Sequence, residues 1–251
     1  DNSSAFRMDP EVPLVVPEVN SQAILKHKGI IANPNCSTII MVMALKPIYD
    51  LAKIKRVIVS TYQAVSGAGK EGIDELDAQV RDHSEGREMT ANILPSASAE
   101  KHYPIAFNLI PQIDVFCDNL YTKEEMKMVN ETKKIMEDYE MRITATTIRV
   151  PVYRSHSESV NIELEKEVDL GAMREALAKF PGVTVQDDPS KQEYPMPLYT
   201  SEKDDVYVGR LRRDESCEKS YNMWVVGDQI RKGAALNTLQ IAETMIKNGW
   251  I

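Results

Sequence analysis

The sequence has few cysteines and no long apolar run, and both shortages restrict the class of protein. Its three cysteines, Cys36, Cys117 and Cys217, are too few and too scattered for a disulfide framework or a CxxC metal site. No segment approaches the roughly 18–20 consecutive apolar residues that a membrane-spanning helix needs. We therefore expect a protein of the reducing cytoplasm, with no metal site and no membrane partner.

A surplus of basic charge is also missing. The 251 residues include 30 Lys and Arg against 38 Asp and Glu, which gives a net charge of −8 at pH 7. No basic block with interleaved aromatic residues occurs, so the composition argues against a nucleic-acid partner.

The start of the chain lacks an initiator Met, a signal-peptide pattern and an opening strand-and-helix unit. It runs DNSSAFRMDPEVPLVVPEVN, which is typical of the interior of a protein. We expect an N-terminal portion to be absent from this chain.

What is present is a mixture of helical and strand patterns. The apolar run 37–51 predicts a buried helix that Pro47 would kink or end early. Thr122 and Glu125 predict a capping box for a helix over 121–139. Further helices are expected over 71–81, 170–180 and 232–250, and strands over 57–61, 141–152, 159–168, 204–214 and 219–229. Residues 84–121 form a long irregular excursion, and the whole predicts an α+β fold around a mixed or antiparallel sheet.

Cys36 lies between Asn35 and a long apolar segment, in NPNCST. It is either a packed core thiol or a nucleophile whose pKa, about 8.5 in reference peptides, is lowered at a helix start. Backbone N–H groups there, with the Asn35 side-chain amide, would then stabilise an oxyanion. The segment alone leaves both interpretations open.

Two further residues carry candidate chemistry near a predicted strand junction. His156 lies in RVPVYRSHSES, either as a partner base or as a hydrogen-bonded surface residue. A Cys–His pair does not by itself distinguish a hydrolase from a dehydrogenase. Arg149 is either a carboxylate clamp or a surface strand arginine.

Two local patterns have both ordinary and functional interpretations, and for the first the spacing alone favours the ordinary one. Glu131 and Lys134 share a helix face and are explained by a solvated ion pair or by ligand binding. The SGAG turn at 66–69 is either a plain strand-to-helix turn or a place where the backbone approaches a ligand.

Six segments, in the same order along nearly the whole chain, together resemble the aspartate-β-semialdehyde dehydrogenase family, and its bacterial branch above all. They are NPNCST around Cys36, STYQAVSGAG around Gln63, HYPIAFN at 102–108, ETKKIM at 131–136, RVPVYRSHSES at 149–159 and KGAALNTLQIAE at 232–243. The resemblance implies a catalytic domain like the C-terminal domain of glyceraldehyde-3-phosphate dehydrogenase. It also implies a remnant of a Rossmann-type domain.

The resemblance further implies the reaction. The family reduces L-aspartyl-4-phosphate to L-aspartate-4-semialdehyde with NADPH, in lysine, threonine and methionine biosynthesis. Cys36 would be the nucleophile that forms a thioester, His156 the general acid–base, and Gln63 a residue that orients the intermediate.

By the same resemblance, the substrate is held by charge. Asn35 would lie beside the nucleophile, Arg149 would hold the α-carboxylate, and Glu131 would meet the ammonium group. Lys134 and Arg7 would bind the phosphate.

The cofactor residues follow from the same resemblance, with the main NADP-binding half missing. The nicotinamide end would contact Asn237 and the turn formed by Ser66, Gly67, Ala68 and Gly69. We expect the tail of the cofactor domain at 1–35, a catalytic and dimerisation domain at 36–232, and a terminal helix at 233–251 that packs back on the cofactor domain.

Three alternatives remain open. An N-acetyl-glutamyl-phosphate type of reductase shares the thioester chemistry, but its acetylated amine has no charge for Glu131 to meet. The chain is otherwise a dimerisation module without catalysis, or a Cys–His hydrolase that needs no nicotinamide. A homodimer is expected, with a tetramer as the other option.

Overall fold

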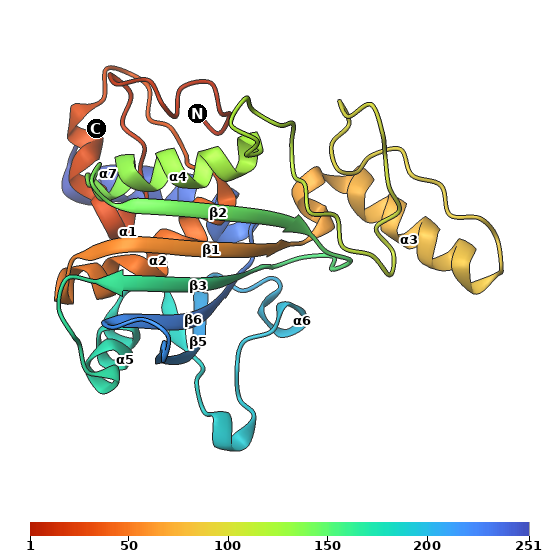
Figure 1. Ribbon diagram of the computed structural model, residues 1–251. Helices are drawn as coiled ribbons and strands as arrows, with labels where there is room; N and C mark the ends of the chain where they lie inside the picture. Colours follow the sequence, from red (N-terminus) through yellow and green to blue (C-terminus); the bar gives the residue numbers. More distant parts are fainter. Residues whose placement is uncertain (251) are drawn as a thin grey trace.

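The chain folds around a six-stranded mixed sheet with the strand order β2-β1-β3-β6-β5-β4 (Figure 1). The computed structural model describes residues 1–250. The strands are β1 (Ile54–Gln63), β2 (Arg142–Arg149), β3 (His156–Leu164), β4 (Val183–Val185), β5 (Val206–Arg213) and β6 (Ser220–Gly227). β1 and β2 are parallel, as are β4 and β5, and the other neighbours are antiparallel. The predicted α+β fold with a mixed sheet is confirmed.

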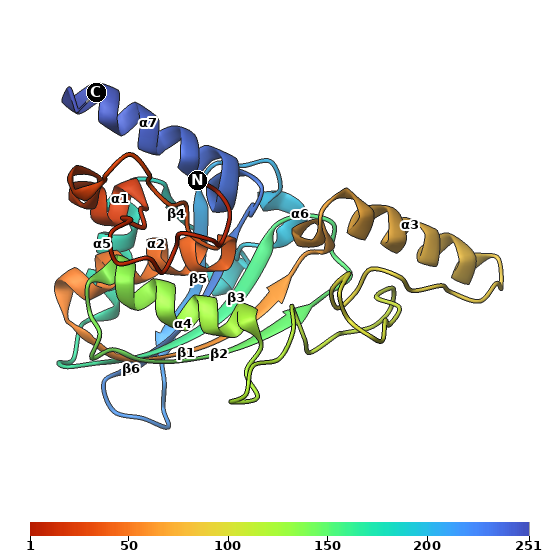
Figure 2. The ribbon, with the colours of Figure 1, turned by 90° about the horizontal axis from the view of Figure 1, so that it is seen from above.

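The helices complete the fold and lie mainly on one side of the sheet (Figure 2). They are α1 (Pro17–Asn20), α2 (Cys36–Leu51), α3 (Lys70–Ser84), α4 (Lys123–Met136), α5 (Leu170–Lys179), α6 (Pro197–Thr200) and α7 (Leu236–Asn248). The other side of the sheet carries Tyr62 and Trp224, whose ring centroids are 5.5 Å apart. No helix within residues 1–250 is long and apolar enough to cross a membrane.

Helix α2 is the centre of the main core. It is apolar nearly all round because the sheet and the helices α4 and α5 surround it. The helix continues through Pro47 to Leu51, so the prediction that it ends early is wrong. Pro47 and Ile48 are both buried, and burial of the last turn offsets the one backbone hydrogen bond that proline cannot make.

Helix α4 begins at the predicted capping box. The Thr122 hydroxyl accepts the Glu125 N–H at 3.2 Å, and the Glu125 carboxylate accepts the Thr122 N–H at 2.7 Å. The other oxygen of Glu125 accepts the Thr147 N–H of β2 at 3.0 Å. The cap therefore fixes both the start of α4 and its position on the sheet.

The stretch between α3 and α4 is irregular, as predicted, and with α3 it projects from the body of the protein (Figure 1). Its small core consists of Val65, Leu76, Leu94, Ile105, Ala106 and Ile110. The buried amide of Gln79 organises the loop, because it accepts the N–H groups of Ile105 and Ala106 and donates to the Thr90 carbonyl. One side chain thus satisfies three backbone groups that no strand or helix pairs.

Both ends of the chain lie side by side. The predicted C-terminal helix starts with a π-helical turn at Arg231–Ala235, continues as α7, and stops at Gly249, whose φ of 65° is left-handed. Asn237 of α7 is fully buried and donates to the Val15 carbonyl at 2.9 Å.

The short elements β4 and α6 were not predicted, since three or four residues carry too little periodicity.

Candidate active site

Cys36 is the first residue of α2, and Asn35 caps the helix. The Asn35 Oδ1 accepts the N–H groups of Ser37 at 3.1 Å and Thr38 at 3.2 Å. The Asn35 Nδ2 donates to Glu124 Oε1 at 2.8 Å. The cap therefore occupies the N–H groups of Ser37 and Thr38, and Glu124 holds one N–H of the Asn35 amide. The expectation that these groups serve an oxyanion stays a prediction.

The thiol of Cys36 is not activated in this state. Burial, and next to it the nearby Glu124 charge, raise its pKa from 9.0 to about 12. Arg149 and the hydrogen bonds of Ser37 act in the lowering direction, but they are the smaller causes. The prediction of a lowered pKa is wrong for the free protein, because desolvation outweighs the helix start.

His156 begins β3 with a fixed tautomer. Its Nδ1 accepts the Ala64 N–H at 3.0 Å, so the proton of the neutral ring is on Nε2. The ring is fully buried, and Nε2 has no hydrogen-bond partner within residues 1–250. Burial and the neighbouring Arg149 charge hold the pKa of His156 well below 6.5. The resting imidazole is therefore neutral and presents an N–H donor.

Arg149 ends β2 directly beside Gln63 of β1 in the sheet register. It is 3% exposed, which excludes the interpretation as a surface arginine. Its Nη1 donates to the Ala64 carbonyl at 2.6 Å, so Ala64 links the guanidinium and the His156 ring. A methyl group at Gly67 would lie 2.7 Å from Arg149 Nη1 and 3.2 Å from His156 Cε1. The turn at Val65–Ala68 thus closes one wall around both side chains.

Gln63 connects the end of β1 to the start of α2. Its Nε2 donates to Ser37 Oγ at 2.7 Å and to Glu124 Oε1 at 3.3 Å. Gly233 approaches Cys36 from the other side, where a methyl group would lie 2.9 Å from the Cys36 Cβ. Sequence reasoning identified Gln63 but missed Glu124 and Gly233.

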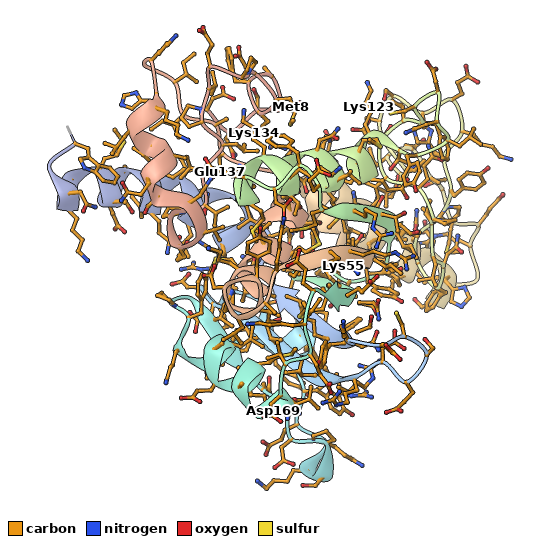
Figure 3. The ribbon with its side chains drawn as sticks, turned by 60° about the vertical axis from the view of Figure 1, so that its left-hand side comes forward. Met8, Lys55, Lys123, Lys134, Glu137 and Asp169 are labelled. Atoms are coloured by element: carbon orange, nitrogen blue, oxygen red, sulfur yellow. The ribbon has the colours of Figure 1, made fainter. Side chains whose placement is uncertain are left out.

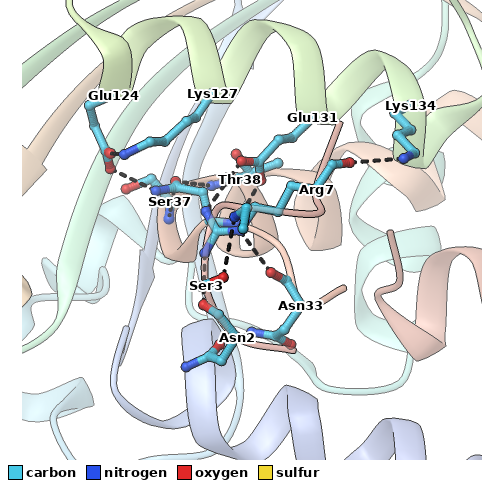
Figure 4. Close-up of polar contacts among 12 residues, drawn as sticks. Asn2, Ser3, Arg7, Asn33, Ser37, Thr38, Glu124, Lys127, Glu131 and Lys134 are labelled. Carbon is cyan, nitrogen blue, oxygen red and sulfur yellow. Dashed lines mark hydrogen bonds and ion pairs between the residues drawn. The ribbon is translucent and has the colours of Figure 1, made fainter. Parts of the chain in front are cut away.

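Glu131 lies on the face of α4 that meets the start of α2 (Figure 4). Its Oε2 accepts the Asn35 N–H at 2.6 Å, and its Oε1 is 3.3 Å from Arg7 Nη1. Burial raises the pKa of Glu131, although Arg7 and the Asn35 N–H oppose that shift. Glu131 therefore pairs with Arg7, and the interpretation as a solvated pair with Lys134 is wrong.

Lys134 fastens the N-terminal segment to α4. Its ammonium donates to the carbonyls of Arg7, Asp9 and Val12 at 2.9, 2.7 and 2.8 Å. Figure 3 shows Lys134 facing the segment that carries Met8. In the free protein Lys134 therefore holds backbone oxygens at the place where a phosphate was predicted.

The predicted cofactor residues are divided between two places. Ser66 and Gly67 belong to the turn beside His156, with Ala68 and Gly69 following. Asn237 makes its hydrogen bonds elsewhere, since its Nδ2 donates to the Val15 carbonyl and to Asn33 Oδ1. No cluster of three or more His, Cys, Asp or Glu side chains in the described part of the chain is arranged to hold a metal ion.

Comparison with known proteins identifies the family. Residues 45–232 match the family model "Semialdehyde dehydrogenase, dimerisation domain". Aspartate-semialdehyde dehydrogenase of Aquifex aeolicus is 56% identical over 253 residues, covering 100% of this chain and 73% of the relative. The chain belongs to the aspartate-semialdehyde dehydrogenase family.

Other members of the aspartate-semialdehyde dehydrogenase family are similar to this chain over nearly its whole length. The Bacillus subtilis enzyme is 53% identical, with 98% of this chain and 72% of the relative covered. The crystal structure of aspartate semialdehyde dehydrogenase II from Vibrio cholerae, complexed with ASA, superposes with a TM-score of 0.92 at 46% identity. That alignment covers 98% of this chain and 71% of the Vibrio chain. Residues 1–27 match the model "Semialdehyde dehydrogenase, NAD binding domain", so the chain is related to oxidoreductases that use a nicotinamide cofactor.

The raised pKa of the Cys36 thiol leads to a prediction that needs no substrate. In the folded protein at pH 8, we expect iodoacetamide to alkylate exposed Cys217 faster than Cys36, because only a thiolate reacts. The reaction of Cys36 should still accelerate between pH 9 and pH 11. Peptide mass spectrometry at fixed times measures both rates, and unfolding in urea should make them equal. A plateau for Cys36 below pH 8.5 would contradict the assigned pKa.

Proposed function

We propose that this chain carries the acyl-transfer site of an NADP-dependent aspartate-semialdehyde dehydrogenase. The reaction would convert L-aspartyl-4-phosphate to L-aspartate-4-semialdehyde and inorganic phosphate. The observation that supports it most is that the buried guanidinium of Arg149 and the neutral imidazole of His156 both bond to Ala64, and that the Arg149 charge acts on Cys36. The names of the relatives support the same reaction.

The site suits a substrate with three charged groups. Arg149 would bind the α-carboxylate and Glu131 the ammonium, while Arg7 and Lys134 would bind the phosphate. In the free protein Glu131 and Arg7 neutralise each other at 3.3 Å. Substrate binding would therefore exchange this internal ion pair for two ion pairs with the ligand, which fixes the acyl carbon beside Cys36.

Proton positions follow from the tautomer of His156. The sulfur of Cys36 would attack the acyl carbon as a thiolate, with its proton leaving to solvent or to the departing phosphate. The carbon–oxygen bond to phosphate then breaks and a thioester remains. The Nε2–H of His156 would donate to the acyl oxygen as negative charge develops there, and it holds the proton that this oxygen needs when reduced.

A nicotinamide cofactor fits only part of the chain. The absence of a Cβ at Gly67 leaves room beside His156, as a close approach to the nicotinamide ring requires. When bound, NADPH supplies the hydride that reduces the thioester. Asn237 is committed to internal hydrogen bonds, and the match to the NAD-binding family model covers residues 1–27 alone. We therefore expect the 251-residue chain alone to bind NADP weakly and to turn over negligibly.

The division into a cofactor-domain tail at 1–35, a catalytic and dimerisation domain at 36–232 and a terminal helix at 233–251 belongs to this proposal. So does the homodimer, which the match to a dimerisation domain supports. Glu131 separates the proposal from its nearest alternative, because an N-acetylated substrate leaves this buried carboxylate without a cation.

Acylation without cofactor tests the proposed function directly. Mixing the chain with L-aspartyl-4-phosphate is expected to yield one aspartyl thioester on Cys36 and one equivalent of phosphate. Intact-protein and peptide mass spectrometry detect the adduct, and hydroxylamine should release it. Cys36→Ser should abolish the thioester, whereas Cys217→Ser should leave it unchanged.

Two outcomes would overturn this proposal. One is an adduct that forms equally on Cys217, which would mean that the site does not direct the reaction. The other is a faster reaction with N-acetyl-L-glutamyl-5-phosphate, which would assign the chain to the alternative reductase.

A further inference from the structure

Glu124 lies next to the nucleophile, yet no sequence pattern assigned it a role. It is in the first turn of α4 and is 6% exposed. Its oxygens face the start of α2 and the end of β1 (Figure 4). A carboxylate buried beside a thiol is unfavourable for forming a thiolate, so its presence calls for an explanation.

The contacts of Glu124 join two residues of the candidate site. Its Oε1 accepts from Asn35 Nδ2 at 2.8 Å and from Gln63 Nε2 at 3.3 Å, and its Oε2 accepts from Lys127 Nζ at 3.1 Å. We propose that Glu124 is a positioning residue, which fixes the side-chain amides of Asn35, the residue before Cys36, and of Gln63, which also bonds Ser37, the residue after it. This inference deepens the proposed function and rests on it.

The carboxylate determines which way each amide faces. A carboxylate only accepts hydrogen bonds, so the atoms of Asn35 and Gln63 that meet it must be NH₂ groups. Asn35 therefore turns its Oδ1 to the helix cap. Gln63 uses its two N–H bonds on Glu124 and Ser37, which leaves its carbonyl oxygen to meet the ligand. Gln63 thus acts as an acceptor toward the substrate, not as an oxyanion donor.

Lys127 limits the electrostatic effect of Glu124. It lies between Glu124 Oε2 and Asp114 Oδ2, at 3.1 Å from each. The Glu124 charge raises the pKa of Cys36, and the Lys127 cation partly neutralises that charge. Glu124 therefore has two opposing effects: it orients the amides of Asn35 and Gln63, and its charge makes the Cys36 thiol less reactive.

Glu125 is a natural control for Glu124. It follows Glu124 in the chain and is 8% exposed. Its oxygens accept only the backbone N–H groups of Thr122 and Thr147. Its role is to hold α4 in place, so replacing it tests the effect of a buried carboxylate that does not contact Asn35 or Gln63.

The experiment measures the rates at which Cys36 is alkylated and acylated in the full 251-residue chain. Glu124→Gln is expected to change these two rates in opposite directions. In Glu124→Gln, iodoacetamide should alkylate Cys36 about threefold to fourfold faster for each unit by which the pKa falls, since the tenfold gain in thiolate is partly offset by lower nucleophilicity. Acylation by L-aspartyl-4-phosphate should become about tenfold to a hundredfold slower, because the amides lose their fixed orientation. Lys127→Met should slow alkylation, since the Glu124 charge is then uncompensated.

Glu125→Gln should lower the melting temperature and leave the pH profile of Cys36 alkylation unchanged. The proposal is overturned if Glu124→Gln changes neither rate, changes both in the same direction, or behaves like Glu125→Gln. Should Glu124→Gln fail to fold, the alkylation rate of Lys127→Met decides, and an unchanged rate overturns the proposal. Alkylation needs no substrate, so it is independent of the proposed function. If the variants change the alkylation rate as expected but L-aspartyl-4-phosphate never acylates the chain, the proposed function is refuted.

Discussion

Gly67→Ala is expected to slow acylation of Cys36 by L-aspartyl-4-phosphate by about a hundredfold. The added methyl group would lie 2.7 Å from Arg149 Nη1 and 3.3 Å from His156 Nε2. Both side chains are buried and held by Ala64, so they cannot move aside without breaking those hydrogen bonds. The backbone of Gly67 is outside the left-handed region, which means that the effect comes from the contact alone.

Single-turnover acylation followed by mass spectrometry measures this loss. Gly171→Ala is the matched control, because its methyl group would meet only the Asp169 side chain, at 2.8 Å, at the start of α5. That variant should lose stability without losing acylation rate. A Gly67→Ala protein that is acylated at the parent rate would show that the turn does not confine Arg149 and His156.

Glu158→Gln is expected to stabilise the protein, and increasingly so as pH rises. Glu158 of β3 is fully buried, and neither carboxylate oxygen has a hydrogen-bond partner within residues 1–250. Burial raises its pKa well above 4.5. The folded protein therefore keeps a proton that the unfolded chain releases, and a glutamine of the same shape removes that difference.

The sign follows from proton linkage. Below pH 4.5 both states are protonated, so the contribution of Glu158 to stability is fully present there. As pH rises toward the folded-state pKa, the unfolding free energy falls by up to about 1.4 kcal/mol per pH unit. Urea unfolding of the parent and Glu158→Gln between pH 4 and pH 9 measures the unfolding free energy of each. His156 titrates in both proteins, so its contribution cancels when one free energy is subtracted from the other.

Glu163 of the same strand is the control for this prediction. It is partly exposed and bonded to Lys55, which lowers its pKa. Glu163→Gln should therefore lose a little stability above pH 4.5, the opposite direction. Parallel stability curves for the parent and Glu158→Gln would mean that Glu158 is ionised in the folded protein.

Local signals in the sequence were sufficient for much of the fold. The run after Cys36 predicted α2 almost to the residue, and the pair Thr122 and Glu125 predicted the start of α4. Each depends on neighbours within one helical turn. Of the two effects predicted for Pro47, the early end is wrong, because the burial that offsets its missing N–H comes from strands far away in the sequence.

The candidate site was less predictable because tertiary contacts determine its electrostatics. At Cys36 desolvation and the Glu124 charge raise the pKa more than Arg149 and the Ser37 hydrogen bonds lower it, and these groups come from distant parts of the fold. Lys134 was assigned to phosphate, yet it binds three carbonyls that are more than 120 residues away in the chain. Glu124 and Glu125 are identical neighbours in sequence, and only the fold distinguishes the one that reaches Cys36.

The buried Lys232 connects the two ends of the chain next to the nucleophile. Its ammonium donates to Glu18 and Gln240 at 2.6 Å each, which couples the first residues of the chain to its last helix. The next residue, Gly233, presses against Cys36. The packing around the Cys36 Cβ therefore depends on how α1 and the start of α7 are held together.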